Sequence, residues 1–416
     1  MQNQRHDLVT TRPAKFRSAL LLLIGASWCL AVPGRLGAVG FRLPNQDPEA
    51  IARGNAFAAT ADNPSAIYYN PAGITQLKGD NIRVGLYVIS ADTKYTSSSG
   101  ATAKTDTSLQ TVPQIYYVHS YANVPISVGL GVYAPYGLSL DWGNNSPLNR
   151  VAESGSLVYA TINPVVAWRV NHTLSIAIGP NINYSQVTFK QALDPFGVTQ
   201  FKFKGDDTEF GFNAGILWQP HPMWSFGANY HYATTLNYKG TASQNAYPDG
   251  NPFPSSTSSS ASIVFPQFVV GGISFRPTTN WNFEFDLDWT EWSAVKQIIL
   301  ENTPFGNLPI PLNYRSGFMY EFGVTRQLGK GYFVSAGYIY SENSSPDANF
   351  NPLIPDANLQ LGSVGFGHRC RHWDWAIAYH FAYNGGHTVQ NNSNALADGT
   401  YKTFNNAVNA SATFKF

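Results

Sequence analysis

The stretch Phe283-Glu284-Phe285-Asp286-Leu287-Asp288-Trp289 decides the fold class of this chain. In an extended strand, alternate side chains point to opposite faces, so the apolar residues share one face and the three carboxylates share the other. A helix would place these carboxylates on no common face. Apolar groups towards lipid and charged groups towards water are typical of a transmembrane barrel wall. The stretch therefore predicts a membrane-spanning β-strand.

The composition of the whole chain agrees with this interpretation. Charged residues make up 12% of the 416 residues, and aromatic residues make up 14%. The charged share is about half of what soluble domains carry. Past residue 35 the sequence has no apolar run long enough for a transmembrane helix. A transmembrane β-barrel explains these features, and a soluble β-sandwich is the alternative on composition alone. The net charge of +1 gives no reason to expect a nucleic-acid partner.

Segments rich in Tyr, Phe, Val and Ile recur from Ile82 to Phe416. An even number of strands brings both termini of a bacterial barrel to the periplasmic side. The sequence thus predicts an all-β, antiparallel transmembrane barrel of about 14 strands in the outer membrane. We place these strands at 82–95, 111–121, 125–141, 156–170, 172–190, 206–219, 223–239, 261–276, 280–298, 313–328, 331–343, 358–369, 372–387 and 402–416.

The connections between these segments alternate in length. Short links near Asn123, Asn171 and Lys330 alternate with long polar links such as residues 97–107 and 240–260. Outer-membrane barrels have short periplasmic turns and long external loops, whereas a sandwich has no reason for this regularity. The chain ends in a strand with a terminal phenylalanine, which resembles the signal that such barrels present to their insertion machinery.

The first residues of the chain predict a secretory signal. Basic residues between Arg5 and Arg17 precede the apolar stretch Ala19–Val32, which is too short to span a bilayer. Cleavage after Ala31 or after Ala38 fits the small residues there, and we prefer Ala38. The first predicted unit is therefore a signal peptide at residues 1–38.

Cysteine, histidine and acidic residues are the candidate metal ligands of this sequence. Cys29 is expected to leave with the signal, so Cys370 has no disulfide partner. His368, Cys370 and His372 alternate along a short basic turn, which does not close a tetrahedral site. The carboxylates of residues 283–289 suggest calcium, but lumen-facing carboxylates usually pair with basic side chains, here Arg53. We expect no metal and no cofactor.

Residues 39–81 do not alternate and have a different composition. Pro48–Ala61 is rich in alanine, which favours short helices. The lumen of a fourteen-strand barrel is wide enough to hold such a segment. We therefore predict a helical N-terminal hatch at 39–81 that plugs the lumen, followed by the barrel at 82–416.

At this point the sequence resembles the FadL family, whose members carry long-chain fatty acids or aromatic hydrocarbons across the outer membrane. The resemblance covers nearly the whole mature chain and implies a fourteen-strand barrel with a hatch of short helices. The hatch motif is Asn70, Pro71, Ala72 and Gly73. The other matching stretches are Gly40-Phe41, residues 52–56, 61–64, 129–142 and 288–293.

The resemblance also implies a route for the ligand. In the family, outer loops catch the ligand, an inner apolar pocket holds it, and a hatch shift releases it sideways through an inward kink of the third strand. Here Pro135 interrupts that strand, with Gly131, Tyr133 and Gly137 around it. Proline cannot donate to a ladder and glycine permits a bend, so the residues themselves indicate a wall kink. The alternative is that Pro135 marks the end of a strand near a loop.

Arg150 and Arg315 are the candidates for binding a fatty-acid carboxylate, because arginine gives a carboxylate a two-point contact. Arginines at barrel rims also bind lipopolysaccharide phosphates, which is the alternative.

The function expected from the sequence is passive uptake of hydrophobic small molecules, with long-chain fatty acids first. Motifs of the Gly-x-Ser-x-Gly, Cys-x-x-Cys and His-Glu-x-x-His types are missing from the sequence, so we expect no enzyme. The alternatives are an aromatic hydrocarbon channel of the same family and a nonspecific porin or structural barrel, which the predicted hatch disfavours. The expected partners are the ligand, outer-membrane lipid and lipopolysaccharide, and the protein is expected to be a monomer.

Overall fold

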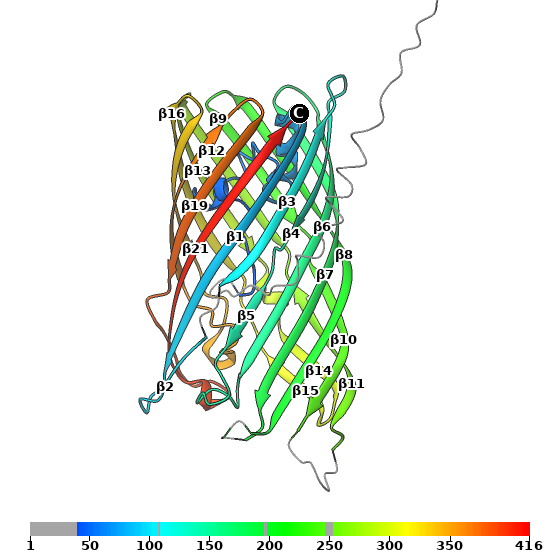
Figure 1. The fold of residues 1–416 in the computed structure, drawn as a ribbon, viewed down its shortest axis with the longest axis vertical. Coiled ribbons are helices and arrows are strands. Elements are labelled where there is room, and N and C mark those ends of the chain that lie inside the picture. The colour runs from blue at the N-terminus through cyan, green and yellow to red at the C-terminus, as the bar shows by residue number, and fades with distance from the viewer. Residues whose placement is uncertain (1–39, 107–108, 195, 197, 246–252) are drawn as a thin grey trace, which may run out of the picture.

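The computed structural model describes residues 40–416 except 107–108, 195, 197 and 246–252 (Figure 1). The predicted signal peptide, with Cys29 and both cleavage positions, lies outside the described residues. None of the described helices is both long and apolar enough to cross a membrane.

The described strands form one antiparallel sheet that closes into a barrel where β1 pairs with β21. The 21 strand segments make up fourteen strands of the wall, which confirms the predicted fold class. Their bounds are β1 (Gly79–Thr96), β2 (Thr102–Lys104), β3 (Gln110–Ser120), β4 (Ile126–Tyr133), β5 (Leu138–Asp141), β6 (Ser154–Arg169), β7 (Leu174–Ala192), β8 (Gln200–His221), β9 (Trp224–His231), β10 (Thr234–Gln244), β11 (Ser256–Phe265), β12 (Phe268–Thr278), β13 (Trp281–Thr290), β14 (Gln297–Thr303), β15 (Gly306–Pro311), β16 (Gly317–Gly329), β17 (Tyr332–Ser341), β18 (Leu359–Arg369), β19 (Trp373–Tyr383), β20 (His387–Val389) and β21 (Gly399–Lys415).

Several predicted strands are interrupted in the structure. The third consists of β4 and β5, and the eighth consists of β11 and β12. Pro135 and Pro266 stand in these two interruptions, where the missing N–H group ends a ladder. The predicted strand at 280–298 is β13 and the start of β14, joined through η2 (Trp292–Ala294), and β14 and β15 form an added hairpin.

The two ends of the barrel differ as the sequence predicts. Six short turns, among them the one at Lys330, lie at the end that carries the C-terminus, which we call the turn end (Figure 1). The long connections, which include η3 (Asp347–Asn349) and η4 (Ala395–Ala397), lie at the opposite loop end. By the asymmetry of outer-membrane barrels, the turn end faces the periplasm.

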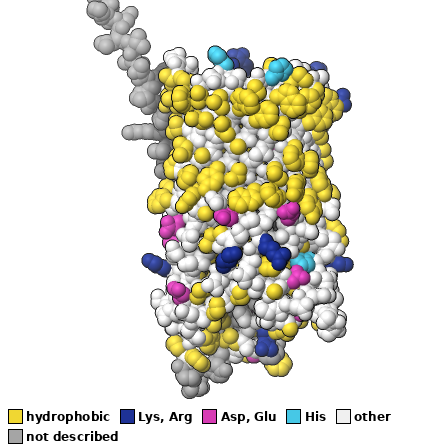
Figure 2. Space-filling model, turned by 180° about the vertical axis from the view of Figure 1, so that it is seen from behind, with side chains coloured by type: hydrophobic (Ala, Val, Ile, Leu, Met, Phe, Trp, Pro, Cys, Tyr) yellow, Lys and Arg dark blue, Asp and Glu magenta, His cyan; other side chains and the backbone are white. Residues whose placement is uncertain are grey.

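Side chains sort by face along β13. Glu284, Asp286 and Asp288 are buried, while Phe283 and Phe285 are exposed on the outside. Figure 2 shows the outer surface of one side of the barrel, where apolar side chains gather in the half near the turn end and most charged side chains lie towards the loop end. An apolar band of this kind is the surface that faces lipid.

The N-terminal segment, residues 40–78, lies within the ring of strands near the turn end (Figure 1, blue). It contains α2 (Pro48–Ile51), α3 (Ala66–Tyr69) and η1 (Pro71–Gln76). Asp47 caps α2 by accepting from the backbone N–H of Glu49, and Pro48 follows at the first helical position. Helix α2 contacts β18 and β19, whereas η1 contacts β6, β7 and β8 across the lumen.

Candidate ligand-binding site

The carboxylates of β13 hold the N-terminal segment to the wall. The Arg42 guanidinium lies 2.7 Å from Asp288, and Arg53 lies 2.5 Å from Glu284. Asp286 accepts hydrogen bonds of 2.8 and 2.7 Å from two successive backbone N–H groups of the segment. The predicted pairing with Arg53 is confirmed, whereas Arg42 was not expected from the sequence. These carboxylates are thus engaged as partners of the segment, which supports the structural over the calcium interpretation.

The predicted hatch motif lies at the bend between α3 and η1. Asn70 Nδ2 donates to one carbonyl of the segment at 2.7 Å and to one of β8 at 2.9 Å. Its Oδ1 accepts from Ala72 N at 3.2 Å, which caps η1, and Pro71 is the first residue of that helix. A Cβ atom on Gly73 would lie 2.2 Å from Ala61 O, so only glycine fits this close approach. The motif therefore shapes the segment and joins it to the wall.

The third strand contains one extra residue at its interruption. Tyr133 pairs with Thr161 at the end of β4, and Leu138 pairs with Leu157 at the start of β5. Between these two pairs the third strand advances by five residues, from 133 to 138, whereas its partner β6 advances by only four, from 161 to 157. One surplus residue in a ladder is a β-bulge, which bends the strand.

The wall is not continuously paired beside this bulge. Residues 115–120 of β3 pair with β4. Nearer the loop end, residues 111–114 of β3 pair with β1 on one side and, among the described residues, have no ladder partner on the other. β5 pairs with β6. Within the described part of the chain, no ladder links β3 to β5, and we call this interruption of the backbone pairing the break.

The start of the N-terminal segment occupies this break. Leu43 N donates to Pro135 O at 2.7 Å, and Gly137 N donates to Phe41 O at 2.9 Å. Gln46 Nε2 adds a hydrogen bond of 2.7 Å to Ala134 O. The backbone groups that the bulge leaves unpaired are thus satisfied by the segment and not by the neighbouring strand.

The other two predicted kink residues pack inside the barrel. Tyr133 is buried, and its hydroxyl donates to Asn163 Oδ1 at 3.1 Å. A Cβ atom on Gly131 would lie 2.9 Å from a methyl group of Ile67, so this glycine lets α3 approach β4 closely. All four predicted residues therefore lie where the segment meets the third strand.

An apolar cavity of about 100 Å³ lies in the lumen on the loop-end side of the segment. Its lining contains no charged side chain. Phe41 is part of that lining and packs edge-on against Trp292 at 5.0 Å and Phe265 at 5.3 Å. The residues that line it are Phe41, Leu138, Gly155, Ser156, Leu157, Val187, Thr188, Phe189, Phe203, Ala261, Ile263, Ile298, Leu300, Ile310, Leu312, Asn351, Leu353 and Ile354.

Sequence reasoning missed this cavity, although β8 contains a signal for it. Phe201 and Phe203 are buried in the lumen, whereas Lys202 and Lys204 are exposed outside. This alternation has the opposite sense to that of β13. A strand with apolar residues inward and lysines outward stands beyond the lipid band and lines an apolar space.

Neither predicted arginine lines the apolar cavity. Arg150 is exposed, and its backbone carbonyl accepts from Gln191. Arg315 is exposed beside a separate polar cavity of about 450 Å³ that Asp347 and Asn391 also line. The structure therefore does not bring these two arginines together at a ligand site.

The basic turn that carries His368 and Cys370, which we expect to bind no metal, lies at the turn end. Cys370 Sγ lies 3.1 Å from His368 Nδ1, and His368 Nε2 lies 2.9 Å from Lys330 O. Both nitrogens of His368 thus face groups of the turns themselves.

Comparison with known proteins supports one family. The family described as outer membrane protein transport protein (OMPP1/FadL/TodX) matches residues 30–415. The long-chain fatty acid transport protein of Escherichia coli K12 is 22% identical, over 78% of this chain and 83% of that protein. A putative outer membrane protein of Neisseria meningitidis is 23% identical, over 83% of this chain and 85% of that protein.

Two solved structures show the same fold. A Pseudomonas aeruginosa FadL homologue superposes with a TM-score of 0.81 at 19% identity, covering 91% of this chain and all of that one. The toluene transporter TodX of Pseudomonas putida superposes with a TM-score of 0.72 at 17% identity, covering 92% and 99%.

Proposed function

The chain belongs to the outer membrane protein transport family (OMPP1/FadL/TodX), and from that premise we propose long-chain fatty acids as its ligands. The family comprises outer-membrane transporters of hydrophobic compounds, which fits the prediction that the chain is not an enzyme. The observation that carries the proposal is the apolar cavity without charged lining. An alkyl tail that enters it gains about 0.8 kcal/mol for each buried methylene.

In this proposal the carboxylate of the acid stays at the open mouth of the cavity. Burying a carboxylate without a cation or donor is costly, and the lining offers no cation. Affinity is thus expected to come from the tail and to rise with chain length.

A second candidate is a monoaromatic hydrocarbon, which the size of the cavity favours. A dry cavity of about 150 Å³ holds one benzene ring, and this one measures about 100 Å³. A neutral ring needs no cation. At about 100 Å³ the cavity is smaller than one that holds benzene, so either ligand needs Phe41 to move, and a single ring needs a smaller displacement than a sixteen-carbon chain.

For release, we propose that residues 40–78 act as the hatch, in agreement with the predicted unit at 39–81. Phe41 lines the cavity, and its backbone carbonyl accepts the hydrogen bond from Gly137 N. A ligand that displaces Phe41 therefore frees the backbone of the break between β3 and β5. The ligand then leaves sideways through the wall into the membrane. The buried segment also argues against a nonspecific porin, which needs an open aqueous lumen.

Replacing Leu157 tests the cavity as the ligand site. Leu157→Asp places a charge among apolar side chains, whereas Leu157→Met keeps their character and volume. We expect uptake of radiolabelled hexadecanoate by whole cells to fall by at least about tenfold in the first variant and to stay near the parent level in the second.

Parallel assays with radiolabelled toluene distinguish the two ligand candidates, since the true ligand is the one whose uptake needs the parent protein. Heat-dependent migration in gels shows that both variants fold. Parent-rate uptake of both compounds by Leu157→Asp would mean that this cavity is not on the route.

A further inference from the structure

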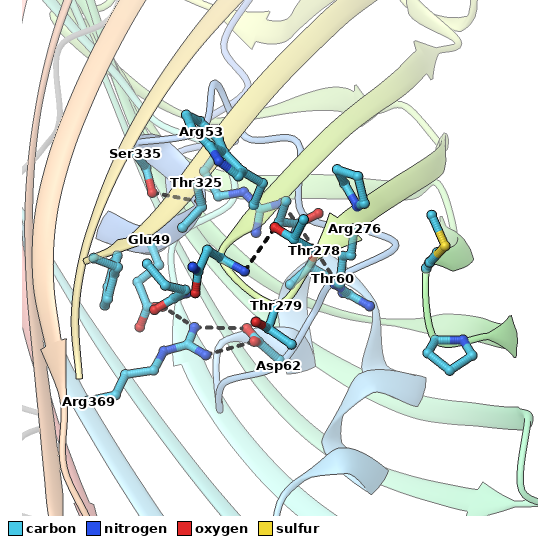
Figure 3. A pocket seen from close by; sticks show the side chains of 18 residues that line it. Glu49, Arg53, Thr60, Asp62, Arg276, Thr278, Thr279, Thr325, Ser335 and Arg369 are labelled. Atoms are coloured by element: carbon cyan, nitrogen blue, oxygen red, sulfur yellow. Dashed lines mark hydrogen bonds and ion pairs between the residues drawn. The ribbon is translucent and has the colours of Figure 1, made fainter. Parts of the chain in front are cut away.

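A second cavity, of about 470 Å³, lies at the turn end between the N-terminal segment and the wall (Figure 3). The segment contributes polar side chains to it, and the turns between β8 and β9 and between β12 and β13 form its rim. Since the turn end faces the periplasm, this cavity is entered from that side. Its lining consists of Glu49, Arg53, Thr60, Asp62, Pro222, Met223, Arg276, Pro277, Thr278, Thr279, Asn280, Trp281, Asn282, Thr325, Gln327, Phe333, Ser335 and Arg369.

Two of the three arginines in this lining have carboxylate partners. Arg369 lies 2.5 Å from Glu49 and 2.8 Å from Asp62. Arg53 lies 2.5 Å from Glu284 in the wall behind it. In Figure 3 the pair of Arg369 and Asp62 lies apart from Arg276. The charges of these two arginines are therefore balanced within the protein.

Arg276 is the third lining arginine and has no such partner. Among the described residues, no carboxylate oxygen lies within 4.0 Å of its guanidinium, and its hydrogen bond is to Thr60 Oγ1 at 3.4 Å. Asp62 acts on it only from farther away and already accepts 2.8 and 3.2 Å hydrogen bonds from Arg369. The positive charge of Arg276 is therefore not balanced by a nearby carboxylate of the described residues and is available to bind an anion.

The rest of the lining gives the cavity two kinds of surface. Thr278 and Thr279 line the same cavity as Arg276, and their hydroxyl groups can donate hydrogen bonds. Phe333 is buried and supplies apolar ring surface in the same cavity, whereas Trp281 stands at the rim with its ring stacked on the outward Phe283. A ligand that fits both surfaces carries an anionic group on an apolar body.

We propose that this cavity binds one amphipathic monocarboxylate from the periplasm. The carboxylate accepts hydrogen bonds from the Arg276 guanidinium, whose planar fork matches its two oxygens. The apolar body packs towards Phe333. One unbalanced cation calls for one negative charge, which favours a carboxylate over a doubly charged phosphate. The site lies on the opposite side of the segment from the apolar cavity and goes beyond the proposed function.

The test measures protection of an introduced thiol in purified full-length protein reconstituted in lipid vesicles. Cys370→Ser removes the native thiol of the described chain, and Thr279→Cys places a new one in the cavity rim. Octanoate is expected to slow alkylation of this thiol by an impermeant maleimide, while octanol at the same concentration leaves the rate unchanged.

Arg276→Gln in the same background should weaken the protection by octanoate about tenfold, since a hydrogen bond to a charged group is lost. Arg276→Lys, which keeps the charge, should retain part of it. Equal protection by octanol, or undiminished protection in Arg276→Gln, would overturn the proposal. Stronger protection by octyl phosphate than by octanoate would also overturn it, in favour of a phosphate group. Because no arm measures uptake, failure here leaves the proposed transport function unaffected.

Discussion

The two halves of the lumen use the same alternation of side chains in opposite senses. Towards the turn end, β13 points Glu284 and Asp286 inward and Phe285 outward. Towards the loop end, β8 points Phe203 inward and Lys204 outward. The outer surroundings change from lipid to water along the wall, and the inner surface changes with them. One barrel thereby offers a polar interior that anchors a segment and an apolar interior that we propose as the ligand site.

Phe41 and Arg42 stand at the boundary between these two halves. Phe41 lines the apolar cavity, and its neighbour Arg42 forms the 2.7 Å ion pair with Asp288. Arg42 also lies over the Phe268 ring, 3.5 Å from its centre. Phe41 thus lies in the apolar half and Arg42 in the polar half. Because they are neighbours in the chain, a movement of Phe41 also disturbs the contacts of Arg42. The proposed coupling of ligand binding to the position of the segment rests on this adjacency.

Deleting the N-terminal segment tests whether this segment keeps the lumen closed. Deleting residues 40–76 leaves the strands intact, because β1 begins at Gly79. The carboxylates of β13 would then face water, and a lumen of this width would fill with it. We expect conductance in planar bilayers to rise by at least about tenfold. Arg42→Lys, which keeps the positive charge, is the control and should change conductance little. An inserted barrel that conducts no better than the parent would show that the segment is not the barrier.

Deleting the surplus residue of the third strand tests whether the ligand leaves through the break. Deleting Ala134 brings β4 and β5 into one register, so that β5 can pair with β3 in place of the segment. We expect uptake of hexadecanoate to fall about tenfold while binding to purified protein stays within about twofold, because exit and binding use different parts of the lumen.

Pro135→Val is the matched control for this deletion. The substitution restores a donor but keeps the surplus residue, so its effect should be smaller than that of the deletion. Equal uptake by the parent and the deletion variant would exclude the break as the exit.

The sequence predicts well what a local period encodes. Residues 283–289 revealed the wall strand, and the carboxylates there correctly suggested a basic partner in Arg53. The 41–43 pairing with 135–137 was out of reach, since it depends on a backbone contact between distant segments. The apolar cavity was missed for a different reason. Its residues come from many strands, and the reversed pattern at 201–204 lies before the predicted strand at 206–219, whereas the observed strand β8 already begins at Gln200.

Arg150 and Arg315, the two arginines predicted to bind a fatty-acid carboxylate, are expected to affect uptake least. Both side chains are exposed, and neither lines the apolar cavity. A charge exposed to water contributes little to a contact, and salt screens it further. We therefore expect Arg150→Ala, Arg315→Ala and their combination to change hexadecanoate uptake by less than about twofold, equally at low and at physiological salt. Leu157→Asp, assayed alongside, shows the response of a residue that does line the cavity. A loss of tenfold or more for hexadecanoate, with toluene uptake unchanged, would instead mean that the acid is captured at the loops, and that the apolar cavity alone does not select the ligand.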